Sequence, residues 1–363
     1  MSEFDYLRPI GLVGPSAQPS TAAGQILPLA GGPLGFTACE TLRRRSAGDI
    51  ERRIVGLAEL SGRNACAAPL ARLTAARQDF AGLAMDRPHV MGVINVTPDS
   101  FSDGGDRFDH GRAVADGLAM LEAGATLLDV GGESTRPGAE PVPEDEELRR
   151  VLPTVRGLAE SGAPVSIDTR RARVMAEALE AGARVINDVT ALAGDPDSIA
   201  VAAEEAVPVI LMHMQGEPRT MQREPSYADA ALDVYDWLAE RVAACEAAGI
   251  PRARLAVDPG IGFGKTLEHN LQILDSLALF HGLGCPVVLG VSRKSFIGRL
   301  SGAEQPKQRV PGSLAAALAG LERGVQIVRV HDVAETVQAF EVWRAIASVP
   351  LGGPGHSELR KSA

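Results

Sequence analysis

Chemically versatile side chains follow eight apolar segments of this sequence, each at the point where the segment ends. They are Asn95, Asp129, Asp168, Asn187, Asp188, His213, Asp258, Ser292, Arg293, Lys294, Arg329 and His331. Carboxylates and amides bind N–H donors, whereas arginine and lysine bind anions. If the chain gathers these ends, they predict a site for a small polar ligand with hydrogen-bond donors at one end and negative charge at the other.

A local explanation exists for each of these residues taken singly. An Asp or Asn at the end of a strand often caps the next helix, because its side chain accepts hydrogen bonds from free backbone amides. For Asp129 and Asp188 the sequence leaves this structural interpretation and a ligand-binding one equally open. Eight polar strand ends in succession favour a shared site.

The elements that must position these residues alternate between strand and helix patterns. Eight apolar runs indicate buried strands, at 90–95, 126–132, 164–169, 184–190, 208–214, 254–260, 286–294 and 325–332. Helical spacing appears between them, clearest at 112–125, 171–183, 231–250 and 313–324. Apolar strands separated by helices indicate a parallel sheet covered on both faces, and eight units predict an α/β fold of the (β/α)8 TIM-barrel type. An open doubly wound sheet is the alternative fold.

The overall composition is that of a globular protein with an aliphatic core. Of 363 residues, 45% are hydrophobic and only 4% are aromatic, which suits one sizeable α/β domain with an appendage. The formal net charge of −10 disfavours a surface for nucleic acid or for an anionic membrane. A local basic pocket for a small anion remains compatible with this charge.

Cysteine usage and the N-terminal sequence favour the cytoplasm. Cys39, Cys66, Cys245 and Cys285 lie far apart and lack the spacing of zinc ligands, so we expect reduced thiols in the core. The first residues are acidic where a signal peptide needs positive charge, and no apolar run reaches the roughly eighteen residues of a membrane span. We therefore expect a cytoplasmic protein that binds neither nucleic acid nor membrane.

The glycine-rich segment 260–266 has some features of a phosphate-binding loop but fails its spacing. GIGFGKT follows a strand and precedes a helix, yet the G-x-x-x-x-G-K-[ST] pattern requires glycine where Pro259 stands. The H-E-x-x-H and G-x-S-x-G patterns do not occur. Nucleotide hydrolysis, metalloprotease and serine-hydrolase chemistry therefore lose support.

Seven motifs together resemble those of the dihydropteroate synthase family. They are GVINVTPDSFSDGG, DVGGESTRPGA, SIDT, INDV, DPGIGFGK, GVSRKSFIG and IVRVHDV, in this order within residues 90–346. The resemblance implies a TIM barrel, a homodimer and the condensation of (7,8-dihydropterin-6-yl)methyl diphosphate with 4-aminobenzoate in folate biosynthesis, assisted by Mg²⁺. It leaves residues 1–85 and the last dozen residues unexplained.

Matching these motifs residue by residue implies roles for the strand ends. The pterin ring would be bound by Asp168, Asn187, Asp258, Lys294 and Arg329. The diphosphate would be bound by Asn95, Thr135, Arg329 and His331, and the metal ligand would be Asn95. A buried carboxylate suits the amidine-like edge of a pterin, and the aliphatic stem of a lysine packs on its ring.

Two long loops, 97–106 and 133–139, follow the first two predicted strands and would complete the site. The 4-aminobenzoate site would consist of Phe101, Thr135, Arg136, Pro137 and Ser292, and the catalytic residues would be Asp103, Arg136 and Lys294. The Gly, Ser and Pro content of the loops predicts mobility. The absence of an evident nucleophile is consistent with ionisation of the C–O bond, loss of pyrophosphate and addition of the arylamine.

The chain ahead of residue 86 is predicted to be an extension to the barrel. We expect an N-terminal extension at 1–85, the barrel at 86–349 and a flexible tail at 350–363. Segment 15–25 is typical of a loop or linker, whereas 48–62 and 68–84 show helical apolar spacing with charged opposite faces. The extension is therefore predicted to be small and mainly helical.

Two other functions compete with this interpretation. A corrinoid-linked methyltetrahydrofolate methyltransferase uses a related pterin barrel, but it needs neither the STRPG loop nor the diphosphate pocket of Arg329 and His331. A non-catalytic pterin-binding homologue would use the N-terminal extension as an interaction module. The presence of Asp103, Arg136 and Lys294 argues against this second alternative.

Overall fold

The alternating strands and helices expected after residue 89 form a closed barrel in the computed structural model, which describes residues 5–14, 25–46, 49–96, 110–134, 140–217 and 219–348. Its eight strands lie in the spatial order β10-β9-β8-β7-β6-β5-β12-β11. They are β5 (His89–Asn95), β6 (Leu127–Gly131), β7 (Val165–Asp168), β8 (Val185–Asp188), β9 (Val209–Met212), β10 (Leu255–Asp258), β11 (Val288–Gly290) and β12 (Ile327–Val330). A parallel bridge between Val257 and Val287 closes the ring, so the open-sheet alternative is wrong.

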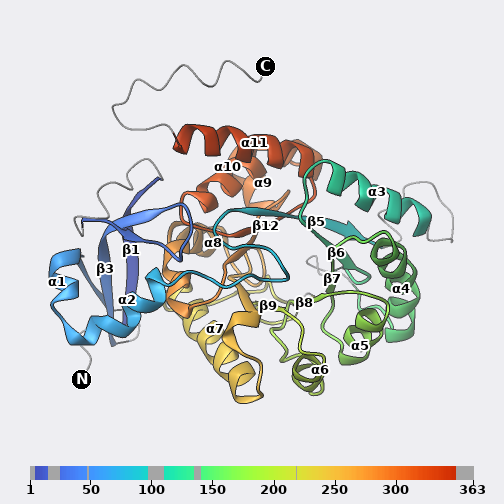
Figure 1. Ribbon diagram of the computed structural model, residues 1–363, viewed down its shortest axis with the longest axis horizontal. Helices are drawn as coiled ribbons and strands as arrows, with labels where there is room; N and C mark the ends of the chain where they lie inside the picture. The colour runs from blue at the N-terminus through green and yellow to red at the C-terminus, as the bar shows by residue number, and fades with distance from the viewer. Residues whose placement is uncertain are drawn as a thin grey trace.

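Helices run between successive strands and cover the outside of the barrel (Figure 1). They are α3 (His110–Glu122), α4 (Glu144–Glu160), α5 (Ala172–Glu180), α6 (Ser198–Glu204), α7 (Ala230–Ala247), α8 (Leu267–Asp275), α9 (Ser295–Ser301), α10 (Val310–Leu321) and, after the last strand, α11 (Val333–Ala347). Short 3-10 turns complete the crossovers: η4 (Arg252–Arg254), η5 (Leu277–Leu283) and η6 (Pro306–Arg309). The largest buried apolar cluster lies between this helical layer and the strands.

The amino-terminal end of the barrel is filled by apolar side chains. Phe80 and Met85, which precede β5, pack there against residues of seven strands: Met91, Leu127, Val185, Ile210, Ala256, Val288 and Ile327. Because this end is apolar and closed, a polar ligand can bind only at the opposite, carboxyl-terminal rim, where the polar strand ends lie.

The N-terminal region is an antiparallel sheet, so the prediction of a mainly helical appendage is wrong. Its strands are β1 (Tyr6–Val13), β2 (Leu27–Pro28), β3 (Gly35–Ser46) and β4 (Asp49–Gly56). The long strand β3 pairs with β1 along one edge and with β2 and β4 along the other. Among the residues of this region that the structure describes, helical structure is limited to α1 (Leu57–Ser61), η2 (Asn64–Cys66) and α2 (Ala67–Thr74).

The misassigned segment is the first half of 48–62. Its apolar residues fit helical spacing, but residues 49–56 pair antiparallel with β3 in a register that places Thr41 opposite Arg53. Pairing with a strand earlier in the chain thus overrides the local pattern. In the predicted helix 68–84, only the part up to Thr74 is helical. Phe80, beyond it, belongs to the apolar cluster that fills the amino-terminal end of the barrel.

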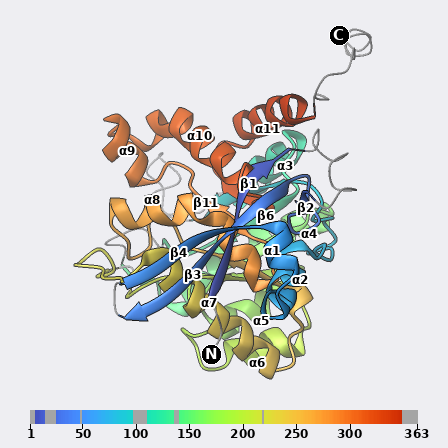
Figure 2. The same ribbon diagram turned by 90° about the vertical axis from the view of Figure 1, so that its left-hand side faces the viewer.

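The N-terminal sheet has a core of its own and lies against the outside of the barrel beside α7 (Figure 2). Phe36, Cys39, Val55, Leu60 and Leu73 are buried in this second core. On the barrel side of the sheet, the ring of Tyr6 contacts the ring of Tyr235 of α7 edge-on, with centroids 5.6 Å apart.

Several smaller predictions can be placed on this fold. All four cysteines are free and buried, as expected. Among the described residues no helix is long and apolar enough to cross a membrane. The predicted linker at 15–25, apart from its last residue, and the tail at 350–363 lie outside the described residues, and the domain boundaries stay predictions.

Candidate active site

An arginine and two aspartates from different strands meet at the carboxyl-terminal rim. Arg329 of β12 donates from Nε to Asp129 Oδ2 of β6 at 2.6 Å and from Nη2 to Asp168 Oδ2 of β7 at 2.7 Å. Asn187 of β8 donates from Nδ2 to the same Asp129 oxygen at 3.0 Å. The rim therefore holds a continuous polar network built from four strands.

Burial sets the charges of this network. It raises the pKa of Asp168 to about 7, because desolvation outweighs the attraction of Arg329 and the Asp129 carboxylate adds repulsion. Burial opposes the charge of Arg329, but Asp129 and Asp168 raise its pKa above the ordinary value. Asp129 is completely buried, and its Oδ1 atom has no hydrogen-bond partner in the part of the chain that the structure describes. Such an orphaned acceptor is suited to an N–H donor of a bound ligand.

Asp258 and Lys294 are two further charged groups of the rim, close enough to influence each other electrostatically. Asp258, at the end of β10, accepts from the backbone N–H of Gly260 at 2.7 Å. Lys294 Nζ donates to the carbonyl oxygen of Ile261 and lies 4.7 Å from the ring centroid of Phe263. Burial raises the pKa of Asp258 and lowers that of Lys294 to about 8, and each group's charge moderates the shift of the other.

The backbone at Arg293 fixes the directions of Ser292 and Lys294. Arg293 has φ of 58°, a left-handed conformation that costs a non-glycine residue about 1–3 kcal/mol. Its N–H donates to Ser313 Oγ at 2.8 Å, and its Nε donates to Asp332 Oδ2 at 2.9 Å. These contacts hold the turn in place, so both neighbouring side chains are displayed at the rim.

Known proteins share this architecture and much of this sequence. The family model described as "Pterin binding enzyme" matches residues 91–331. Dihydropteroate synthase of Escherichia coli K12 is 48% identical over 267 residues, which cover 73% of this chain and 94% of that protein. The Xanthomonas albilineans dihydropteroate synthase solved with 4-aminobenzoic acid is 51% identical, with a TM-score of 0.71 over 76% of this chain and 99% of that one. The same enzyme solved with 7,8-dihydropteroate is 49% identical, with a TM-score of 0.68 over 74% and 97%. This chain belongs to the dihydropteroate synthases.

Membership of this family confirms the activity implied by the motifs. A dihydropteroate synthase is an alkyl-group transferase of the folate pathway, which forms 7,8-dihydropteroate. The corrinoid-linked methyltransferase alternative is therefore wrong. The family model begins at residue 91, so the whole N-terminal sheet has no counterpart in it.

The two aspartates left open by the sequence have different roles. Asp188 accepts from Thr190 N–H and hydroxyl at 2.7 Å each and from Leu192 N–H at 2.9 Å, so it holds a turn. Asp129 instead joins Arg329 in the buried network of this synthase. Residue type gave no way to separate them, and Asp129 was missed as a site residue for that reason.

A buried lysine that the sequence pattern did not single out, Lys265, lies beside the strand-end residue His213. Lys265, from the GFGKT segment, has its Nζ 2.9 Å from Nδ1 of His213 and donates to the carbonyl of Phe263 at 2.9 Å. Burial lowers the pKa of both groups; the charge of Lys265 lowers the pKa of His213 further, and the charge of Lys294 lowers that of Lys265. The imidazole of His213 is therefore engaged by Lys265, and this pair supports the glycine loop 260–264.

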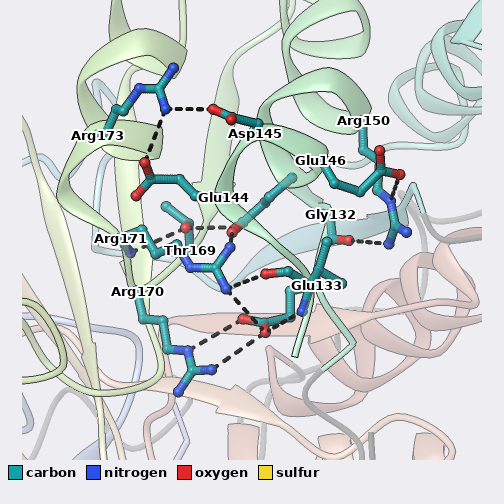
Figure 3. A network of polar contacts seen from close by, with 12 residues as sticks. Gly132, Glu133, Glu144, Asp145, Glu146, Arg150, Thr169, Arg170, Arg171 and Arg173 are labelled. Carbon is teal, nitrogen blue, oxygen red and sulfur yellow. Dashed lines mark hydrogen bonds and ion pairs between the residues drawn. The ribbon is translucent and has the colours of Figure 1, made fainter. Parts of the chain in front are cut away.

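Polar contacts anchor both ends of the STRPG loop (Figure 3). Glu133, just before the loop, accepts from the N–H of Val142 at 3.2 Å and pairs with Arg170 Nε at 3.3 Å. Arg171 donates to the carbonyl of Val142 and pairs with the buried Glu147 at 2.7 Å. The residues that flank the loop are thus held together by side chains from the β7–α5 connection.

Several predicted site residues lie outside the described residues. They are Phe101, Asp103, Thr135, Arg136 and Pro137. The remaining ones, Asn95, Asp168, Asn187, Asp258, Ser292, Lys294, Arg329 and His331, all lie at or just beyond the carboxyl ends of barrel strands. This placement matches the rim predicted from the sequence.

Proposed function

We propose that the rim divides the synthase reaction between a pterin end and a diphosphate end. At the pterin end, Asp258, Asn187 and Asp168 bind the N–H groups of the ring, while Lys294 bonds its carbonyl side and packs its stem on the ring. The buried, unpaired Oδ1 of Asp129 offers a further acceptor there. Supporting this assignment, burial raises the pKa of both Asp168 and Asp258. Buried carboxyl groups with a perturbed pKa are typical of functional sites, where a ligand's N–H donors replace the lost water.

The diphosphate end is assigned to Asn95, His331 and Arg329, together with Thr135. Ser292 Oγ accepts from the backbone N–H of His331 at 3.2 Å and lies 3.1 Å from its Nδ1, so the imidazole is oriented by the rim. Arg329 uses Nε and Nη2 for carboxylates, which leaves Nη1 for a phosphate oxygen.

Asn95 fits the role of a Mg²⁺ ligand. It ends β5 half-buried, and no described residue bonds to its side chain, which leaves a hard amide oxygen available. Within the described ranges no group of three acidic, histidine or cysteine side chains is arranged so that it could hold a metal ion. One protein oxygen plus substrate phosphates is a common way for proteins to bind Mg²⁺. When bound, the ion neutralises charge that develops on the leaving pyrophosphate.

We assign the 4-aminobenzoate site to Phe101, Thr135, Arg136 and Pro137 of the two loops, above Ser292, with Asp103, Arg136 and Lys294 as the catalytic residues. The electron-rich dihydropterin stabilises the methylene cation left by ionisation of the C–O bond. The arylamine then attacks that carbon and loses its proton. Catalysis consists of positioning and of electrostatic stabilisation of the leaving group.

The observation that carries these assignments is the convergence of Asp129, Asp168, Asp258, Lys294 and Arg329 at one rim. The test incubates purified protein with the pterin diphosphate, Mg²⁺ and 4-aminobenzoate and measures dihydropteroate and pyrophosphate. Lys294→Ala should abolish product formation and weaken pterin binding. No product from the wild-type protein would instead support the non-catalytic homologue.

The assignment of the 4-aminobenzoate site to the two loops predicts that the two substrates bind in a fixed order, with the pterin diphosphate first. Diphosphate with Mg²⁺ supplies the charge that organises Asp103 and Arg136, so the empty enzyme should bind 4-aminobenzoate poorly. Titration of 4-aminobenzoate with and without Mg²⁺-pyrophosphate measures this coupling, which must be reciprocal. Equal dissociation constants in the two titrations would show a preformed pocket and exclude the ordered mechanism.

We also propose that the enzyme is a homodimer. Supporting this, Val342 and Ile346 are largely exposed and lie one turn apart on α11, so together they present an apolar surface that a second copy of the chain would cover. Sedimentation of the wild-type protein and of Val342→Glu tests the assembly. A monomer at micromolar wild-type concentration would contradict it.

A further inference from the structure

Arg44 and Tyr6 of the N-terminal sheet make polar contacts with α7. Arg44 of β3 donates from Nη2 to Asp233 Oδ1 at 2.7 Å and to Asp236 Oδ2 at 3.2 Å, and from Nε to the hydroxyl of Tyr6 at 2.9 Å. Tyr6 donates in turn to Asp236 Oδ2 at 2.7 Å. The guanidinium is therefore held on three sides, with a fixed direction toward the first turns of α7.

Asp233 bridges this arginine to the segment that leads into α7. While Oδ1 accepts from Arg44, Oδ2 accepts from the backbone N–H groups of Ala228 at 2.7 Å and of Asp229 at 3.3 Å. A second arginine, Arg52 of β4, pairs with Asp229 at 3.0 Å. Residues 219–229, here called the lead-in segment, are thus tied at their end to the N-terminal sheet.

The other contacts of the lead-in segment reach the glycine loop of the pterin end. The hydroxyl of Tyr227 donates to the carbonyl of Gly264 at 2.8 Å, and Gln222 Nε2 donates to the carbonyl of Gly262 at 2.7 Å. Gly262 packs on the stem of Lys294, since a Cβ there would lie 3.3 Å from Lys294 Cδ. Each step from the sheet to this lysine is a direct contact.

We infer that the N-terminal sheet supports the pterin site, and that Arg44 is a positioning residue that acts through Asp233 and the lead-in segment on the glycine loop 260–264. This inference rests on the proposed role of Lys294 in pterin binding. The family model begins at residue 91, so the pterin-binding family does not by itself supply this support. Pterin affinity should therefore depend on Arg44, a residue of the N-terminal sheet that lies far in the sequence from the residues of the pterin site.

The test measures pterin binding calorimetrically in full-length variants. Arg44→Gln should weaken pterin affinity about three- to tenfold, the usual size of coupling through such a contact chain. The KM for 4-aminobenzoate should stay unchanged, because its proposed site lies on other loops. Arg44→Lys keeps the charge beside Asp233 but loses the fork, so it should rescue part of the loss and also serves if Arg44→Gln does not fold.

Two matched arginines separate positioning from general loosening of the sheet. Arg45 pairs only with Glu51 of its own hairpin among the described residues, so Arg45→Gln should leave pterin affinity unchanged. Arg8 links the sheet to Asp275 of α8 at 2.9 Å without touching the lead-in segment. Arg8 reaches that segment only indirectly, because its other partner Glu40 also pairs with Arg52, which pairs with Asp229. Arg8→Gln should therefore weaken pterin affinity much less than Arg44→Gln does.

Hydrogen exchange supplies a readout independent of ligand. Amides of the lead-in segment, Ala228 above all, should exchange faster in Arg44→Gln than in Arg8→Gln or Arg45→Gln. The inference is overturned if Arg44→Gln binds pterin as the wild type does, or if Arg8→Gln weakens binding equally. If Lys294→Ala also retains full pterin affinity, the proposed pterin site itself is wrong, and the inference falls with it.

Discussion

Two arginines of this protein each pair with two aspartates, one cluster at the barrel mouth and the other between the N-terminal sheet and α7. The clusters are Arg329 with Asp129 and Asp168, and Arg44 with Asp233 and Asp236. Their distances are similar, but their surroundings differ. The side chain of Asp129 is 0% exposed, whereas that of Asp236 is 45% exposed.

The difference in burial changes what each cluster does. Desolvated charges at the mouth depend on one another, because losing one partner leaves the rest uncompensated. The charges of the outer cluster are partly solvated and screened by water, so its ion pairs contribute little to stability. Their main effect is to hold the N-terminal sheet in a fixed position against α7. The same chemistry therefore serves ligand binding in one place and the attachment of a domain in the other.

The largest expected effect is on the buried cluster. Arg329→Met should lower the free energy of unfolding by about 3–5 kcal/mol, because it leaves Asp129 buried without its cation. Guanidinium chloride unfolding measures the change. Adding Asp129→Asn removes the unpaired charge and should recover part of the loss. Wild-type stability in Arg329→Met would show that water reaches these carboxylates.

A slightly smaller effect is expected on ligand binding at Asp258. Asp258→Asn should weaken pterin binding by about 2–5 kcal/mol, because the ligand's N–H groups lose a buried charged acceptor. Calorimetry with the pterin substrate measures the loss. Asp188→Asn is the matched control: it changes a strand-end aspartate that holds a turn, so pterin affinity should stay at the wild-type value. Equal affinities in both variants would remove Asp258 from the site.

The buried cluster should also make the stability of the protein depend on pH. Burial raises the pKa of Asp168 from 3.8 to about 7, so the folded protein holds this proton more tightly than the unfolded chain. Its contribution is fully present below pH 3.8 and is lost as the pH rises through 7, with a slope of at most about 1.4 kcal/mol per pH unit.

Asp168→Asn should remove this slope. The test measures the free energy of unfolding of the wild type and of Asp168→Asn between pH 4 and pH 8, a range that spans the unfolded and folded pKa values of Asp168. A wild-type profile that coincides with the variant's profile would show that Asp168 stays ionised throughout. Other carboxylates titrate in both proteins and cancel in the difference.

The smallest expected effect is on the outer cluster. Arg44→Gln should lower the free energy of unfolding by about 1 kcal/mol or less, because its partners remain partly solvated. Arg45→Gln, whose ion pair is more exposed, should change it by even less. Thermal unfolding in low and high salt measures both. A loss as large as that of Arg329→Met would mean that burial does not distinguish the two clusters.

Local pattern predicted the barrel because apolar strands and amphipathic helices alternate eight times, and parallel strands must end on one side. It failed for 49–56, where the apolar spacing of Ile50, Ile54 and Val55 is compatible with helix or strand. Pairing with β3 decided the outcome. The connection within this hairpin is short, but the sheet also needs β1, which lies about thirty residues away in the chain.

The sequence by itself determined which side chains stand at the strand ends, since residue type and period are local properties. Only the tertiary structure decided that Asp129 pairs with Arg329, 200 residues later, while Asp188 turns back on its own loop. It likewise decided that Arg44 reaches Asp233 across the domain contact. The physical reason is that a charge acquires its role from the partners and the desolvation that folding imposes, and neither is encoded in its neighbours along the chain.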